Sequence, residues 1–565
     1  MRSRSSLLTS LLFVLGSLGP TGCDGGDGGT SGTTTTTTTT TQVELPDPMD
    51  PLPGVQSTKT DTFATSGVCN QCHLAGQATV MHDTDGQDIS PAYLWRSSMM
   101  AFAAKDPYYL AVWSDARDSR PAAKDAIDAL CTRCHGPAGS VEAGLAGASL
   151  RFETITKGAD PAAHLARDGV TCSLCHQIEG DNLGKAASWS GGFEVGDTRQ
   201  MFGPHEAPQT QPMQFFVDYT PTYADHVASS DLCATCHTVI VPLLDEQGSP
   251  TGGQFVEQAP FFEWQNSSFG SVTACGHCHL PTIGADALPV KSPIAKYPEN
   301  LSSRSPFGKH TFEGGNAFML SILGDQAAWT GSDIDPAELT ASAARGEAHL
   351  RTAAELSIVE SAVEGEDLRL VVQVKNLAGH KLPTGYPGRR VWLHVTALDA
   401  GGATLFDSGA PAEDGHIESD GERVDVAGAI LPHVDEVGPG QAQIWEAVAV
   451  DAGGKPTHRP LDQVAFGKDD RILPDAWSTV GPKADLTKPV GADGDPSFEP
   501  GRDRVTYRIP NGAEVASVSV ALLYQTLPRE AADRLAVTPT PAAVRFSQML
   551  SARPPKAFVI ATTSM

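Results

Sequence analysis

Cys69-Asn70-Gln71-Cys72-His73 is the first of five Cys-x-x-Cys-His segments in this chain of 565 residues, and these segments decide its fold. Ten of the 11 cysteines belong to them, and such a recurrence is not expected by chance. The other four segments are Cys131-Thr132-Arg133-Cys134-His135, Cys172-Ser173-Leu174-Cys175-His176, Cys233-Ala234-Thr235-Cys236-His237 and Cys275-Gly276-His277-Cys278-His279.

This motif is the attachment signal of c-type haem. Two thiols three residues apart reach the two vinyl groups of one haem, and the imidazole that follows coordinates the iron from the proximal side. Zinc ribbons and disulfide pairs do not require a histidine after every second cysteine, so they fit the pattern less well. We predict five c-type haems, with proximal iron ligands His73, His135, His176, His237 and His279.

The spacing of the motifs bears on the fold. Successive first cysteines lie 62, 41, 61 and 42 residues apart, which suggests two haem-pair units preceded by one extra haem. Segments of this length are too short to form hydrophobic cores of their own. The haems should therefore be the core of a mainly helical, loop-rich domain over residues 61–330.

Each iron also has a distal position, and its occupant decides the chemistry. Two histidines give a low-potential electron carrier, whereas an open position permits substrate chemistry. Excluding His277, which lies inside a motif, leaves five other histidines in the haem region for five irons, and one more follows in the C-terminal half. The tentative distal ligands are His82, His164, His205, His226, His310 and His380.

The N-terminal 60 residues indicate export. Residues 1–22 have the pattern of a lipoprotein signal peptide, and Cys23 lies where lipid would be attached; an ordinary cleaved signal is the alternative. Residues 23–60 are rich in Gly, Thr and Pro, which is typical of a disordered tether. We predict a lipoprotein of the cell envelope, periplasmic or on the outer surface, held at a membrane by Cys23.

The pattern changes after the last motif. Residues 331–355 should form a connecting helix, and alternating apolar runs over 356–565 predict an antiparallel β-sandwich. Between two of its strands, residues 379–390 form a Gly- and Pro-rich loop. His380 in this loop could reach a haem, and Arg389 and Arg390 could pair with haem propionates; the alternative is that both arginines pair locally. The predicted fold class is thus α+β multidomain.

Four segments outside the haem motifs carry a resemblance to a known family. They are Trp95–Met100 with Asp106-Pro107, Gly169–Cys172, Glu263–Ser267 and His310–Asn316. With them the chain resembles the multihaem cytochrome c superfamily, in the branch near the tetrahaem cytochrome of ammonia oxidisers and the pentahaem nitrite reductases. The resemblance covers about residues 61–400 and implies that His310 is a distal ligand. The catalytic members of this branch carry Lys in place of one motif His; no such Lys occurs here, which favours electron transfer.

The charge of the chain limits its partners. The net charge is −27, from 40 Lys and Arg against 67 Asp and Glu, which excludes a nucleic-acid partner and favours a redox partner with a basic docking face. We expect an electron carrier rather than an enzyme. The alternatives are an oxidoreductase that acts on a small nitrogen or sulfur compound at one open haem, and a haem-carrying subunit of a larger respiratory complex.

Overall fold

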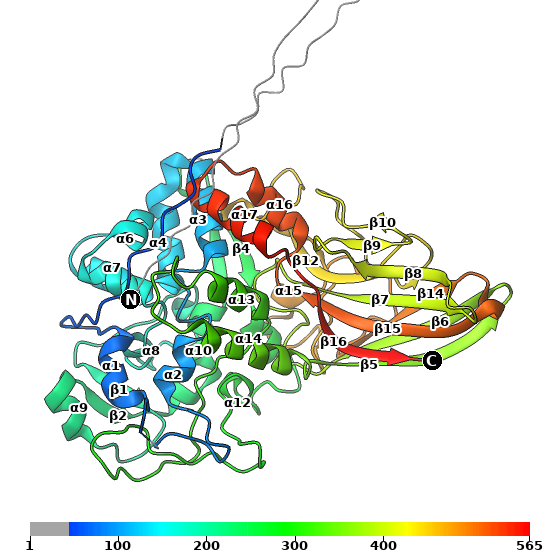
Figure 1. Ribbon diagram of the computed structural model, residues 1–565. Helices are drawn as coiled ribbons and strands as arrows, with labels where there is room; N and C mark the ends of the chain where they lie inside the picture. The colour runs from blue at the N-terminus through cyan, green and yellow to red at the C-terminus, as the bar shows by residue number, and fades with distance from the viewer. Residues whose placement is uncertain (1–44, 79, 246) are drawn as a thin grey trace, which may run out of the picture. The chain divides into compact units, whose positions relative to one another are not determined.

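The computed structural model describes residues 45–78, 80–245 and 247–565, and Leu45–Met565 forms one compact unit (Figure 1). The predicted signal peptide, Cys23 and the first part of the predicted tether lie outside the described residues. In the part of the chain that is described, no helix is both long enough and apolar enough to cross a membrane.

Short helices dominate the first part of the chain, as the motifs predict. Several begin with Pro in the first turn, and Asp106, Asp160 and Asp335 each accept a hydrogen bond from a free backbone N–H of the helix that follows. The helices are α1 (Ser66–His73), α2 (Pro91–Arg96), α3 (Pro107–Ser119), α4 (Lys124–His135), α5 (Pro137–Leu145), α6 (Phe152–Lys157), α7 (Pro161–Arg167), α8 (Cys172–Cys175), α9 (Thr210–Val217), α10 (Ser230–His237), α11 (Pro260–Gln265), α12 (Cys275–His279), α13 (Ala317–Asp325) and α14 (Pro336–Leu350).

Two small strand pairs lie among these helices. Strands β1 (Gln200–Gly203) and β2 (Thr220–Tyr223) are parallel, and β3 (Val239–Leu244) and β4 (Pro250–Gln258) are antiparallel. Because β3 begins two residues after His237, this hairpin fixes the chain that leaves the fourth motif.

The C-terminal part is built from two larger sheets. One has the order β10-β9-β8-β7-β12-β13, with β15 between β7 and β16; the other has the order β11-β14-β6-β5. Their strands are β5 (Ala354–Glu364), β6 (Asp367–Asn376), β7 (Arg390–Asp399), β8 (Thr404–Pro411), β9 (Ile417–Ser419), β10 (Glu422–Arg423), β11 (Glu436–Val437), β12 (Ile444–Val450), β13 (Ala465–Asp469), β14 (Arg502–Ile509), β15 (Val515–Gln525) and β16 (Phe558–Ser564).

Alternating side chains from both sheets meet in one core. Leu370 and Tyr507 come from the smaller sheet, Val395 and Val520 come from the larger one, and all four are buried in the same apolar cluster. The pairing is antiparallel throughout the described strands of these sheets except between β11 and β14. The combination of helices and antiparallel sheets agrees with the predicted α+β class.

Residues 356–565, predicted as a β-sandwich, also contain helices. Helices α16 (Arg529–Ala536) and α17 (Pro541–Ala552) are inserted between β15 and β16, and α17 packs against α3 (Figure 1). Phe546 of α17 and Leu110 of α3 share one apolar cluster. The helical part of the molecule is therefore completed by residues from near the C-terminus.

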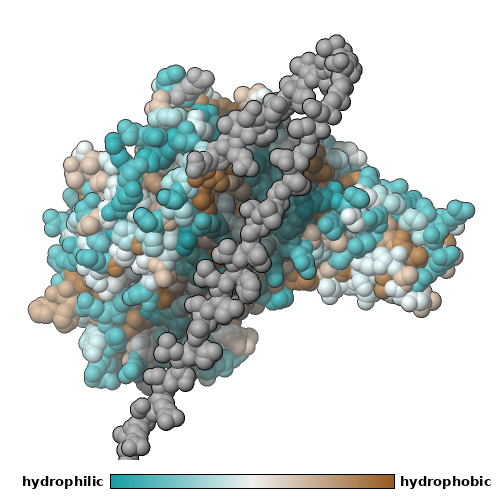
Figure 2. All heavy atoms as spheres, turned by 45° about the horizontal axis from the view of Figure 1, so that its top comes forward, coloured by the Kyte–Doolittle hydropathy of each residue, from teal (hydrophilic) through white to brown (hydrophobic). Residues whose placement is uncertain are grey.

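The predicted tether also ends earlier than residue 60. The Met49 amide donates to the carbonyl of Pro541, the Leu52 amide donates to that of Trp329, and Leu52 is buried among apolar side chains. These contacts offset the conformational entropy that the segment loses when it becomes ordered. Its composition alone does not reveal them. On the face shown in Figure 2, hydrophilic side chains predominate and hydrophobic ones form small groups.

Candidate haem-binding site

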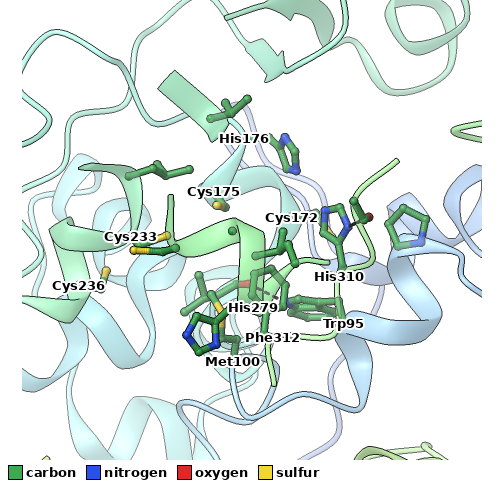
Figure 3. A pocket seen from close by; sticks show the side chains of 18 of the residues that line it. Trp95, Met100, Cys172, Cys175, His176, Cys233, Cys236, His279, His310 and Phe312 are labelled. Carbon is green, nitrogen blue, oxygen red and sulfur yellow. Dashed lines mark hydrogen bonds between the residues drawn. The ribbon is translucent and has the colours of Figure 1, made fainter. Parts of the chain in front are cut away.

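All five Cys-x-x-Cys-His segments line one cavity of about 2940 Å³. A pocket for a single drug-sized ligand measures about 300–1,000 Å³, so this cavity has room for several large groups. Figure 3 shows part of it, with thiols from the third and fourth motifs and imidazoles from the third and fifth.

Short helices position the motif residues. Cysteines three residues apart share a helix face, so each motif presents both thiols in one direction. The motifs lie on α1, at the end of α4, on α8, at the end of α10 and on α12.

Backbone carbonyls orient four of the five proximal imidazoles. The Nδ1–H of each ring donates to a carbonyl, which leaves Nε2 as the metal-binding nitrogen. Burial lowers the pKa of His73, His135, His176 and His237, the last to about 4, which favours the neutral ligand form. The donor and acceptor pairs are His73 and Ile294 (2.8 Å), His135 and Ala103 (2.8 Å), His176 and Phe202 (2.6 Å), and His279 and Glu313 (2.6 Å).

Interactions between thiols indicate which motifs are neighbours. A neighbouring thiol raises the pKa of Cys172, Cys233 and Cys236 above the ordinary thiol value. The contacts join the first motif to the third, the second to the fourth and the fourth to the fifth, while Cys175 of the third motif lies close to both cysteines of the fourth. Pairing of the fourth and fifth motifs agrees with the spacing, but the second lies against the fourth rather than the third. The contacting pairs are Cys69 with Cys172, Cys134 with Cys236, and Cys233 with Cys275.

Two predicted distal histidines face a proximal histidine at a distance suited to a shared metal. With imidazole–metal bonds of about 2.0–2.1 Å, two opposed imidazoles hold their ring centres about 6.2–6.5 Å apart. The rings of His176 and His310 are 6.3 Å apart at 23°, and Figure 3 shows them next to each other. The rings of His279 and His380 are 6.4 Å apart at 19°. These pairs leave room for an iron.

Three other predicted ligands lie outside the cavity lining. His82 donates from Nδ1 to the carbonyl of Val80 (3.0 Å). His164 accepts a hydrogen bond at Nδ1 from the Gln56 amide (3.2 Å), and His226 donates from Nε2 to the carbonyl of Ile178 (2.8 Å). The structure therefore does not bring these three histidines into the cavity with the motifs.

His205 does line the cavity, and so does His349, which the sequence did not single out. His349 lies on α14 with its ring 5.4 Å from that of His279, closer than two opposed ligands of one metal would be. The sequence gives no indication of this position, because a single histidine in an alanine-rich connecting helix such as α14 matches no ligand motif.

The two arginines at the end of the loop before β7 lie in different surroundings. Arg389 lines the cavity, where it donates to the Thr384 carbonyl (2.8 Å) and to Asn316 Oδ1 (3.0 Å). Arg390 is buried away from the cavity against Asp425 (2.8 Å). Arg389 therefore lies where it could pair with a haem propionate, whereas Arg390 pairs locally with Asp425.

One wall of the cavity carries a buried carboxyl group. Glu257 on β4 is 7% exposed and accepts from Gln258 Nε2 (3.3 Å), and burial raises its pKa to about 7. The hydroxyls of Tyr108 and Tyr386, which also line the cavity, are 3.1 Å apart. A proton donor and two hydroxyls thus face the same space.

These features fit haem. The thiols are free, the motif imidazoles are held with Nε2 available, and the cavity has the required size. Moreover, the hydroxyl of Tyr109 is buried without a hydrogen-bond partner in the cavity wall, beside the second motif. A bound group with carboxylates would satisfy it.

Comparison with known proteins supports the same fold. No family model matches the chain, and no curated protein is similar to it. Among solved structures, the penta-heme cytochrome c552 from Thermochromatium tepidum matches with a TM-score of 0.51 and 18% identity, covering 90% of this chain and 100% of that one. At the level of the fold, this chain is therefore similar to a multihaem cytochrome c.

Proposed function

We propose that this chain is a c-type cytochrome that transfers electrons in the bacterial cell envelope through five covalently bound haems. The observation that carries the proposal is that all five attachment motifs line one cavity. When bound, the haems supply reversible one-electron chemistry. The chain supplies thiols that attach them, imidazoles that ligate them, and walls that exclude water.

The distal ligands follow from the ring geometry. His310 pairs with His176, and His380 pairs with His279. Ligation by two histidines is typical of low-potential carriers. His205 and His349 supply further imidazoles in the cavity for two of the three remaining irons.

The thiol contacts define the order of the sites. The first motif is next to the third, the fourth is next to both the second and the fifth, and Cys175 of the third lies near the fourth. Electrons that enter at the first site would pass through the third to the fourth and divide there. The fourth site is thus the junction of the route.

Two matched variants test this route. Cys233→Ser with Cys236→Ser removes the junction, whereas Cys69→Ser with Cys72→Ser removes a terminal site. Each protein should retain four haems. After reduction, stopped-flow reoxidation by a basic acceptor protein should remain one fast phase in the terminal variant and split into phases in the junction variant. Identical kinetics in the two variants would overturn the proposed route.

The partner and the location rest on charge and on the N-terminal sequence. A net charge of −27 favours a partner with a basic docking face, whose association rate should fall as ionic strength rises. An association rate independent of salt would reject this docking. Lipid attachment at Cys23 is tested by labelling cells with a fatty acid and comparing the wild type with Cys23→Ser.

A second candidate function rests on Glu257. This carboxyl group, with Tyr386 and Arg389 in the same cavity wall, could donate a proton to a small nitrogen or sulfur compound at an iron without a distal protein ligand. The buried position of Glu257 keeps a protonated fraction near neutral pH.

Turnover distinguishes this enzyme from a simple carrier. Nitrite, hydroxylamine and tetrathionate would be offered with a chemical reductant. Glu257→Gln should lower any turnover by about 100-fold or more. Glu446→Gln is the control, because Glu446 is another carboxyl whose pKa is raised by burial but lies outside the cavity lining. A wild type without turnover excludes these three substrates and favours the carrier.

A further inference from the structure

A second cluster of metal-ligating side chains lies within the β-sheet part, separate from the haem cavity. Its members come from four different segments. His433 lies between β10 and β11, Asp470 directly follows β13, Asp495 lies in the loop before β14, and Asp503 belongs to β14. The side chains of all four are at most 4% exposed.

The imidazole of His433 is held from both sides. Its Nδ1 is 3.1 Å from Asp470 Oδ2, and its Nε2 is 3.1 Å from Asp495 Oδ2 and 3.8 Å from Asp503 Oδ2. The last distance is too long for a hydrogen bond. His433 Nε2 and one oxygen from each of Asp495 and Asp503 all lie within 4.8 Å of one another.

We propose that His433, Asp495 and Asp503 bind a divalent metal ion, and that this ion is zinc. Tetrahedral zinc with bonds of about 2.0–2.1 Å requires ligand atoms about 3.3–3.4 Å apart, and the distances of 3.1 and 3.8 Å bracket that value. One imidazole with two carboxylates is a donor set that suits zinc.

Hydrogen bonds hold the ligand side chains in place, as is usual at metal sites. Asp470 faces the ring nitrogen opposite the metal-binding one, which is the carboxylate–histidine–metal arrangement. The other oxygen of Asp503 accepts from the Arg504 amide (2.7 Å), and that of Asp495 accepts from the amide and hydroxyl of Ser497 (2.7 Å each).

Charge also favours a divalent ion. Asp470, Asp495 and Asp503 carry three negative charges, and Lys468, 3.4 Å from Asp470, supplies one positive charge. Glu446 also lies near Lys468 (3.5 Å), so the buried group holds an excess of negative charge that a divalent ion would offset.

The ion would tie two loops to strand β14. Because the ligands come together only in the folded chain, binding should stabilise that state. The site does not depend on the haem proposal, so its test reads zinc separately from iron.

The experiment uses the full-length holoprotein, produced with zinc in the medium and purified without chelators. Metal analysis should find one zinc per chain. Asp495→Asn should lower it below one tenth per chain and leave the iron content unchanged. Asp407→Asn is the control, because Asp407 on β8 pairs with His394 on β7 (2.9 Å) as a single carboxylate. This variant should retain one zinc.

Titration of chelator-treated protein with zinc makes the test independent of the metals available when the protein was produced. Wild type and Asp407→Asn should bind one zinc and unfold at a temperature several degrees higher, whereas Asp495→Asn should bind at least 100-fold more weakly. No zinc uptake by the wild type, or equal affinity in Asp495→Asn, would overturn the proposal. One equivalent of another divalent metal that Asp495→Asn loses would support the site and overturn its assignment to zinc.

Discussion

Lys381→Met tests how the β-sheet part holds a haem ligand. Lys381 follows His380 in the chain and is fully buried, with its Nζ 2.6 Å from Asp469 Oδ2. Arg471 also binds this carboxylate, at 2.7 and 2.8 Å. The amide of Lys381 donates to Glu263 of α11 (3.1 Å), so the loop that carries His380 is anchored at both its backbone and its side chain.

The expected loss follows from this geometry. Removing one partner of a buried ion pair costs about 3–5 kcal/mol, because the remaining charge stays buried. Here Arg471 still neutralises Asp469, so we expect the low end, about 3 kcal/mol. Loosening the loop should also displace His380 and leave the haem of the fifth motif without its distal ligand.

Two measurements check this prediction. Denaturant unfolding measures the loss of stability, and electron paramagnetic resonance of the oxidised protein should show one more high-spin haem than the wild type. Arg390→Met is the control, because Arg390 forms an equally buried pair with Asp425 (2.8 Å) outside the cavity. It should destabilise the fold without adding a high-spin haem to those of the wild type. Lys381→Met with every haem low-spin, or the same signal in both variants, would refute the reasoning.

Three further predictions concern single side chains. His310→Ala should convert one haem to high-spin in the absorption spectrum, whereas His164→Ala, outside the cavity, should not; a reversed result would contradict the ring geometry. Leu52→Ala should cost about 3 kcal/mol in urea unfolding, because Leu52 is buried in a core; a loss near zero would restore the tether interpretation. Burial alone would raise the pKa of Asp115, but hydrogen bonds from His458 and Arg459 lower it to about 2. Its ionised form therefore stabilises the fold above about pH 4, and Asp115→Asn should cost about 1–2 kcal/mol at pH 7, a difference that disappears as the pH falls towards 2.

The haem-attachment residues could be predicted because covalent attachment requires a fixed local sequence. Thiols three residues apart with an adjacent imidazole identify all five attachment motifs wherever the fold places them, and the structure brings them to one cavity. Alternation of apolar residues likewise predicted the main strands, such as β6 and β15, because one face of each is buried.

The distal ligands could not be predicted in the same way. His164 and His226 precede motifs by similar distances, but separation along the chain does not determine which way an imidazole points, and both bind backbone groups instead. His380, which the sequence did single out, and His349, which it did not, reach the cavity from a β-sheet loop and a connecting helix through long-range packing. The packing of α17 against α3 could not be predicted either, because the sequence of an amphipathic helix does not specify the element against which it packs.

The intact mass of the purified protein, with haem quantified by absorbance, tests the central claim most directly. The account predicts five covalently attached haems per chain, and the loss of one haem when both cysteines of any one motif are replaced by serine. Fewer than five haems in the wild type, or thiols that remain free to alkylation within a motif, would contradict it.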